Sequence, residues 1–171
     1  MDDHALAAEL ARLAGERLLE IREQGGAADD RQANNLLLEH LRRERPDDAI
    51  LSEESPDDPT RLDHERVWII DPLDGTREYG EPPRTDWAVH VALAVNHVPV
   101  AGAVALPAAG IVLHTAQPPR APAAPPGPIR IAVSRSRSVA DSHIDQRLGF
   151  PAEQRSRRNS CLGGDLGDRL S

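Results

Sequence analysis

Lysine is absent from this sequence of 171 residues, and all 20 residues counted as lysine or arginine are arginine. Without a lysine amine the chain cannot contain a Walker A loop, form a Schiff base with a carbonyl substrate or attach pyridoxal phosphate. Cysteine is almost as scarce, because Cys161 is the single one, so an internal disulfide is excluded. These absences remove several large classes of enzyme and of extracellular domain.

Long hydrophobic runs are also lacking, and we find no signal peptide, membrane-spanning segment or lipidation motif. This pattern predicts a cytoplasmic protein without a membrane partner. The formal net charge of -8 argues against nucleic-acid binding through a basic face, and it would repel an anionic substrate unless metal ions attract it. The acidity therefore indicates a metal site in a chain long enough to bury a core.

Two acidic motifs carry most of the information: Ile-Leu-Ser-Glu-Glu at residues 50–54 and Trp-Ile-Ile-Asp-Pro-Leu-Asp-Gly-Thr at residues 68–76. Residues 67–70 are apolar and rich in β-branched and aromatic side chains, which predicts a buried strand. That strand delivers Asp71 to the carboxyl end of a sheet, where open α/β sheets bind ligands.

The residues after this strand are expected to converge on one point. Pro72 fixes φ and removes a backbone donor, so we expect a sharp turn that returns Asp74 toward Asp71 with the Leu73 carbonyl between them. Oxygen ligands of this kind suit a hard cation, Mg²⁺ in particular. An EF-hand does not fit, because Leu73 stands where an oxygen ligand is needed. The alternative is a plain polar turn.

A phosphate cradle follows directly in the sequence. Gly75 lets a phosphate approach the backbone, and the Thr76 hydroxyl with the N–H groups of the turn can hold an oxyanion. Glu53 follows a short strand directly and is the expected ligand of its pair, with Glu54 in support; the alternative is a solvated acidic loop. His90 alternates with alanines on a strand face and is interpreted as a packed, hydrogen-bonded residue.

Periodicity predicts the elements around these motifs. A helix capped by Asp2 or Asp3 ends near residues 25–26, and a second helix runs from Asp30 to the residues before Pro46. Strands are expected at residues 49–51, 87–95, 99–105 and 111–115, with a tight turn at residues 96–97. We divide the chain into a metal- and phosphate-binding αβ half at residues 1–116, a proline- and alanine-rich connection at 117–128, the start of a second αβ half at 129–153, and an atypical tail at 154–171 that is disordered or frameshifted.

The two motifs resemble the signature of the inositol monophosphatase superfamily, an acidic Glu-Glu pair and then Asp-Pro-(Ile/Leu)-Asp-Gly-Thr after a Trp-Ile-Ile strand. Residues 30–34, 50–54, 75–79 and 86–93 look most like the 3′(2′),5′-bisphosphate nucleotidase (CysQ-type) branch. The resemblance runs from about Leu6 to about Leu148. It implies an α/β fold, a layered sugar-phosphatase-like αβαβα sandwich of which only the N-terminal αβ half is complete.

The resemblance also implies roles for individual residues. Glu53 would bind metal and polarise the attacking water, while Asp71, Asp74 and the Leu73 carbonyl would hold two or more Mg²⁺ ions. Gly75 and Thr76 would hold the phosphate.

Further roles implied by the resemblance are more distant from the motif. Asp30 would pair with Thr76 to orient the nucleophilic water, although a helix N-cap is an ordinary alternative for an aspartate there. Ser134 and Arg135 lie in a stretch that would contact substrate phosphate or ribose, and solvated side chains are the alternative.

The implied activity is Mg²⁺-dependent removal of the 3′-phosphate from 3′-phosphoadenosine 5′-phosphate by metal-activated water. The expected partner is a small phosphate ester, and a homo-oligomer is compatible with the family. Inositol monophosphate hydrolysis is one alternative. A non-catalytic metal- or phosphate-binding remnant is another, because the family's last metal ligand follows a tryptophan in the second half, and neither Trp68 nor Trp87 precedes an aspartate.

Overall fold

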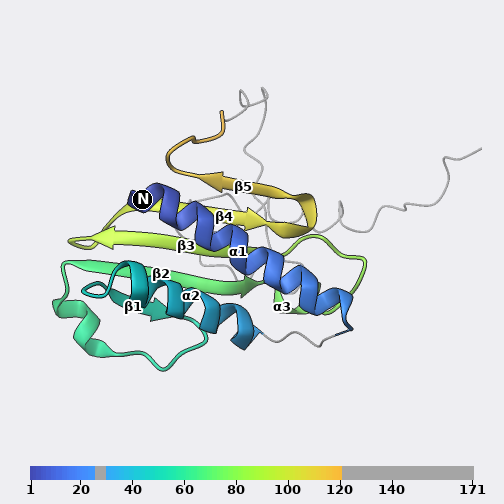
Figure 1. The fold of residues 1–171 in the computed structure, drawn as a ribbon, viewed down its shortest axis with the longest axis horizontal. Coiled ribbons are helices and arrows are strands. Elements are labelled where there is room, and N and C mark those ends of the chain that lie inside the picture. The colour runs from blue at the N-terminus through green and yellow to red at the C-terminus, as the bar shows by residue number, and fades with distance from the viewer. Residues whose placement is uncertain (26–29, 121–171) are drawn as a thin grey trace, which may run out of the picture. The chain divides into compact units, whose positions relative to one another are not determined.

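The computed structural model describes residues 1–25 and 30–120, which form a five-stranded sheet with long helices on one face (Figure 1). The strands lie side by side in chain order, and β1 is parallel to β2 while the other neighbouring pairs are antiparallel. This confirms the mixed α/β class. Residues 121–171, with the predicted second half and the tail, lie outside the described residues, so the division of the chain stays a prediction. The strands are β1 (Ala49–Ser52), β2 (Arg66–Asp74), β3 (Ala88–Val95), β4 (Val98–Leu106) and β5 (Ile111–His114).

Helices α1 (Asp3–Glu23) and α2 (Asp30–Glu44) form where the apolar periodicity predicts them. The Asp2 carboxylate caps α1 by accepting a hydrogen bond from the Ala5 N–H at 2.8 Å. Helix α1 packs on β3, β4 and β5, and α2 packs beside it on β1 and β2 (Figure 1). No helix in this part of the chain is both long and apolar enough to cross a membrane.

Small side chains let α1 lie close to the sheet. Ala101, Ala103 and Ala105 of β4 are buried, and so are several alanines of α1. A Cβ added to Gly15 would come within 2.6 Å of the Cγ of Pro107, which belongs to the short 3-10 helix η2 (Pro107–Ala109). The core is therefore dense although the sequence has few aromatic residues.

Strand β2 corrects one expectation, because it does not end in a sharp turn at Pro72. The strand continues to Asp74, and its register with β3 shifts between Asp71, opposite His90, and Asp74, opposite Ala88. Three steps along β2 therefore match two steps along β3, which is a β-bulge. A bulge tolerates a proline because the missing N–H is not needed by the ladder. The chain turns later, at Gly75, before the short helix α3 (Thr76–Tyr79).

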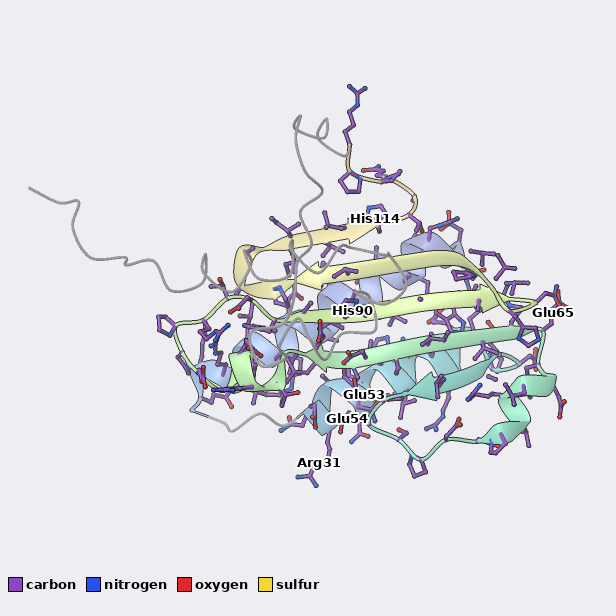
Figure 2. All side chains as sticks on the ribbon, turned by 180° about the vertical axis from the view of Figure 1, so that it is seen from behind. Arg31, Glu53, Glu54, Glu65, His90 and His114 are labelled. Atoms are coloured by element: carbon purple, nitrogen blue, oxygen red, sulfur yellow. The ribbon has the colours of Figure 1, made fainter. Side chains whose placement is uncertain are left out.

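The two faces of the sheet differ. Trp68 and Ile70 of β2 are buried on the side of the helices, whereas Ile69 between them is 42% exposed. Because side chains alternate along a strand, Asp71 lies on the same face as Ile69, away from the helices. Its cross-strand partner His90 lies on that face too (Figure 2). Asp71 thus lies near the end of β2 on the helix-free face.

Candidate metal and phosphate site

Parallel pairing of β1 and β2 places Glu53 beside Asp71. Ser52 is opposite Ile70, and the Glu53 N–H donates to the Ile70 carbonyl at 3.3 Å, so the register continues one residue beyond β1. The carboxyl groups of Glu53 and Asp71 are close enough to share a hydrogen bond. Burial first, and then the charges of Glu53 and Asp74, raise the pKa of Asp71 to about 6, against a hydrogen bond from the Leu73 N–H.

Asp74, the second aspartate of the motif, faces β3. Its Oδ2 lies 3.3 Å from the Nε2 of His90, and its side chain is 63% exposed. The bulge in β2 creates this contact, because it moves Asp74 one residue along β3 relative to a regular ladder. His90 is therefore hydrogen-bonded, as predicted, but its side chain is 41% exposed rather than packed, and its partner is a candidate metal ligand. The pairing of β2 with β3 that brings His90 to this position is not visible in the sequence.

The candidate metal ligands do not form one cluster: two carboxyl groups lie together, and the third lies beside a histidine. Across residues 1–25 and 30–120, no three histidine, cysteine or acidic side chains stand close enough together to form a ready metal-binding group. Glu53 contacts Asp71, whereas Asp74 contacts His90. Because the Asp74 carboxylate is largely exposed, it has room to rotate from His90 toward Asp71. The structure thus brings two of the predicted ligands together and leaves the third to one side.

The donor set still fits a hard divalent cation. Glu53, Asp71, Asp74 and the Leu73 carbonyl offer oxygen atoms alone, which Mg²⁺ and Ca²⁺ prefer. The raised pKa of Asp71 indicates negative charge that its surroundings do not neutralise, and a cation would relieve it. The chemistry of the residues therefore agrees with a Mg²⁺ site.

The turn after β2 contains Gly75 and Thr76, the residues predicted to bind phosphate. Gly75 has a φ of 81°, and an added Cβ would lie 3.2 Å from the Asp86 carbonyl oxygen and 3.3 Å from the Trp87 Cα. Both the backbone conformation and the space thus favour glycine. The Thr76 hydroxyl donates to the Leu73 carbonyl at 3.1 Å, so the predicted phosphate ligand contacts the predicted carbonyl ligand.

Asp30 lies beside Glu54. It is the first residue of α2, and its carboxyl lies close enough to that of Glu54 for the two charges to act on each other. Burial, followed by the charges of Asp30 and Glu53, raises the pKa of Glu54. The structure thus places Asp30 with Glu54 and Thr76 with Leu73, rather than showing the predicted pair of Asp30 and Thr76. Ser134 and Arg135 lie outside the described residues.

An aromatic cluster that the sequence analysis did not identify holds the cradle against α1. The rings of Tyr79 and Trp87 meet edge to face, with centroids 5.0 Å apart, and the Tyr79 hydroxyl donates to the Leu18 carbonyl at 2.7 Å. The Arg22 guanidinium lies 5.4 Å from the Tyr79 ring centroid. The sequence did hold a signal for this cluster, because it has few aromatic residues and most of them lie in or near the motif.

A depression of about 350 Å³ lies next to the carboxylates. His90 belongs both to its lining and to the contact with Asp74. The rest of the lining comes from β3, β4, β5 and the segment that follows β5, including Ala92, Val104, Leu113 and His114. The depression is mostly apolar and therefore suits the less polar part of a ligand whose charged group lies at the carboxylates.

Comparison with known proteins extends these observations. A model of the inositol monophosphatase family matches residues 7–158. The 3′-phosphoadenosine 5′-phosphate phosphatase of Mycobacterium bovis is 51% identical in an alignment 154 residues long, which covers 80% of this chain and 58% of that protein. The protein of the same name from Mycobacterium leprae is 49% identical in an alignment 171 residues long, gaps included, which covers 88% of this chain and 63% of that protein. The chain thus spans less than two thirds of the length of each relative.

A solved structure supports the same grouping. Mycobacterium tuberculosis SuhB superposes with a TM-score of 0.56 at 30% sequence identity, over 66% of this chain and 43% of that chain. The share of this chain that superposes is close to the part that the structure describes.

Proposed function

Because this chain belongs to the inositol monophosphatase family, we propose that it takes part in Mg²⁺-dependent removal of the 3′-phosphate from 3′-phosphoadenosine 5′-phosphate. The observation that carries the proposal is the pair of facing carboxyls of Glu53 and Asp71, where the pKa of Asp71 is raised to about 6. Two relatives named for this phosphatase activity, at 51% and 49% identity, support the choice of substrate.

We assign Glu53, Asp71, Asp74 and the Leu73 carbonyl to metal binding. Bound there, Mg²⁺ supplies positive charge that lowers the pKa of a coordinated water and neutralises phosphate oxygens. Binding requires the Asp74 carboxylate to rotate from His90 toward Asp71, and the exposure of its side chain permits that rotation. A carboxylate must be deprotonated to bind a metal, so Asp71 would give up its proton when Mg²⁺ binds.

We assign the remaining residues to the water and the phosphate. Glu53 faces the site from the end of β1 and accepts a proton from the attacking water. The N–H groups of the turn at Gly75 and the Thr76 hydroxyl bind phosphate oxygens. Asp30 with Thr76 orients the water, which requires both side chains to leave their present neighbours, Glu54 and the Leu73 carbonyl. The partner in this proposal is a small phosphate ester in the cytoplasm, rather than a nucleic acid or a membrane.

The test compares two substrates under a titration of Mg²⁺. We expect kcat/KM to be higher for 3′-phosphoadenosine 5′-phosphate than for inositol 1-phosphate, and to vanish for both when a chelator removes the metal. A preference for the inositol phosphate would move the protein to the other branch of the family. Saturable Mg²⁺ binding without turnover of either compound would favour a non-catalytic metal-binding protein.

A further inference from the structure

Asn34 of α2 and Ser52 at the end of β1 are almost fully buried polar residues, each 5% exposed. The Ser52 hydroxyl donates to Asn34 Oδ1 at 2.7 Å and accepts from the Glu54 N–H at 3.2 Å. The Asn34 Nδ2 donates to the Ser55 hydroxyl at 3.1 Å. A buried polar group is costly unless it is hydrogen-bonded, and these two side chains satisfy each other and the acidic loop.

The network surrounds Glu53 on both sides in the sequence. Ser52 points toward α2, so Glu53, the next residue, projects from the opposite face toward Asp71. The Glu53 N–H is held by the Ile70 carbonyl, and the following N–H, of Glu54, is held by the Ser52 hydroxyl. The backbone around Glu53 is therefore held by a hydrogen bond to β2 and by one to the Ser52 hydroxyl, which in turn bonds Asn34 of α2.

Helix α2 contacts this loop at two successive turns. Asp30 and Asn34 are four residues apart and share one helix face. Asn34 bonds Ser52 and Ser55, whereas the carboxyl of Asp30 lies beside that of Glu54, so the attractive contacts come from Asn34. The loop needs such support because its carboxyl groups repel one another and the charge of Asp71.

We propose that Asn34 and Ser52 are positioning residues that hold Glu53 opposite Asp71 for metal binding, through the backbone of residues 53–55. The inference rests on the proposed function, because it assumes the Mg²⁺ site. Residues that support ligands from outside the coordination sphere commonly set the affinity of a metal site. A buried apolar pair would fill the same space, but it would not specify one conformation of a loop with repelling charges.

The experiment measures Mg²⁺ affinity by calorimetry and thermal stability by circular dichroism on the 171-residue chain. Ser52→Ala leaves Asn34 Oδ1 and the Glu54 N–H without their partner, and we expect about a 10-fold weaker Mg²⁺ affinity. Ser52→Thr keeps a hydroxyl and is expected to restore most of the affinity. Leu41→Val is the control: it removes a methylene from a fully buried position on the same helix and lowers the melting temperature without changing Mg²⁺ affinity.

The outcomes separate this inference from the proposed function. If wild type binds Mg²⁺ no better than Asp71→Asn does, the proposed function fails and the inference fails with it. If wild type binds Mg²⁺ and Ser52→Ala binds it equally well at a lower melting temperature, the inference alone fails. If Ser52→Thr binds Mg²⁺ as weakly as Ser52→Ala does, loss of the hydroxyl does not cause the weaker affinity, and the inference fails. Should Ser52→Ala not fold, Asn34→Leu removes the same hydrogen bond from the helix side and is judged by the same criteria.

Discussion

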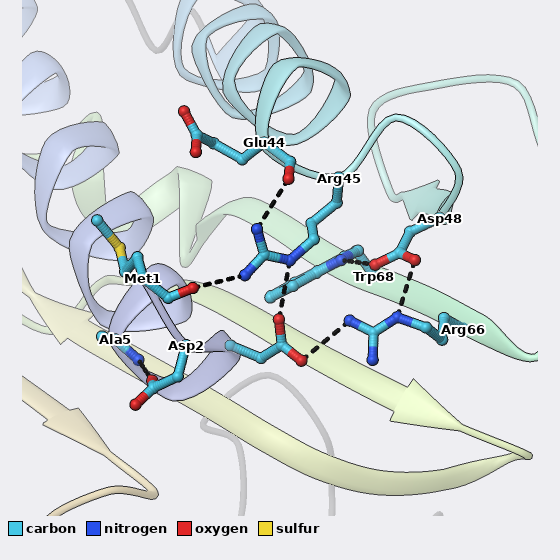
Figure 3. A network of polar contacts seen from close by, with 9 residues as sticks. Met1, Asp2, Ala5, Glu44, Arg45, Asp48, Arg66 and Trp68 are labelled. Atoms are coloured by element: carbon cyan, nitrogen blue, oxygen red, sulfur yellow. Dashed lines mark hydrogen bonds and ion pairs between the residues drawn. The ribbon is translucent and has the colours of Figure 1, made fainter.

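The acidic residues at the two ends of strand β2 have opposite surroundings, arginine at its start and other carboxyl groups at its end. At its start, Arg66 donates to Asp48 at 2.8 Å and to Asp3 at 2.9 Å, and Asp3 also accepts from Arg45 at 2.9 Å (Figure 3). The Trp68 indole N–H donates to the other Asp48 oxygen at 2.8 Å. The network joins the beginning of α1, the segment after α2 and the first residues of β2.

At the end of β2 the carboxyls of Glu53, Asp71 and Asp74 act on one another instead. Burial and these neighbours raise the pKa of Asp71 to about 6. For Asp3, burial also acts to raise the pKa, but hydrogen bonds and charges of Arg66 and Arg45 outweigh it, so the pKa lies below its ordinary value. The pKa of an aspartate is thus raised at one end of β2 and lowered at the other.

The difference separates carboxylates that are neutralised by arginine from carboxylates that act mainly on one another. An acidic group matched by arginine is already satisfied, and its removal should affect stability alone. An acidic group held against other acidic groups lowers stability, and proteins retain such an arrangement where a cation or a reaction uses it. The start of β2 is therefore structural, and its end is the candidate site.

The largest expected effect is the loss of Mg²⁺ binding in Asp71→Asn. Supporting residues outside the coordination sphere are worth roughly 10- to 100-fold in metal affinity, so loss of a direct ligand should cost on the order of 100-fold or more. The variant should be at least as stable as wild type in chelator, because it removes a repelling charge. Calorimetric titration with thermal unfolding tests both statements, and an unchanged affinity contradicts the metal assignment.

Arg66→Leu should have the opposite effects, a loss of stability with Mg²⁺ affinity retained. It breaks two charge-assisted bonds and leaves Asp48, whose side chain is 7% exposed, without its cation. We expect about 2–3 kcal/mol of destabilisation in urea unfolding. The matched control is Arg77→Leu, where a 77% exposed arginine pairs with Glu81, and we expect a change of less than about 1 kcal/mol. Equal losses from the two variants would refute the distinction.

Much of this fold could be predicted from the sequence because the signals are local. The helix cap at Asp2, the end of α2 before Pro46 and the strands of the meander depend on neighbouring residues. The turn at Asn96 and His97 has positive φ angles of 49° and 64°, as a tight hairpin requires.

What the sequence did not predict depends on contacts between distant segments. The bulge that keeps Pro72 within β2 is fixed by the pairing with β3, and the contact of Asp74 with His90 follows from that bulge. Likewise, nothing local to Asn34 indicates that its partner is Ser52. The motif identified Glu53 and Asp71 as candidates, and the parallel register of β1 and β2 explains why they meet. Their catalytic and metal-binding roles stay predictions.

The pH dependence of stability in chelator should also differ between the two ends. A carboxyl with a raised pKa contributes stability that is present below its ordinary pKa of 3.8 and is lost as the pH rises through about 6. Asp3, with a lowered pKa, contributes stability that is lost as the pH falls below its ordinary value. As the pH rises from 3.8 to about 6, the melting temperature of wild type should therefore fall relative to that of Asp71→Asn. A difference in melting temperature that does not change with pH would contradict the raised pKa of Asp71.

The smallest effect is expected at His90, which faces the site without belonging to the predicted ligands. Its contact with Asp74 is 3.3 Å long and exposed to solvent, so its energy is that of a surface interaction, about 0.2–1 kcal/mol. Because Asp74 must leave His90 to reach Asp71, His90→Ala should bind Mg²⁺ as tightly as wild type or up to about five-fold more tightly. His90→Gln, which keeps a donor at a similar reach, should behave like wild type. Weaker binding by the alanine variant would show instead that His90 holds Asp74 in its metal-binding position.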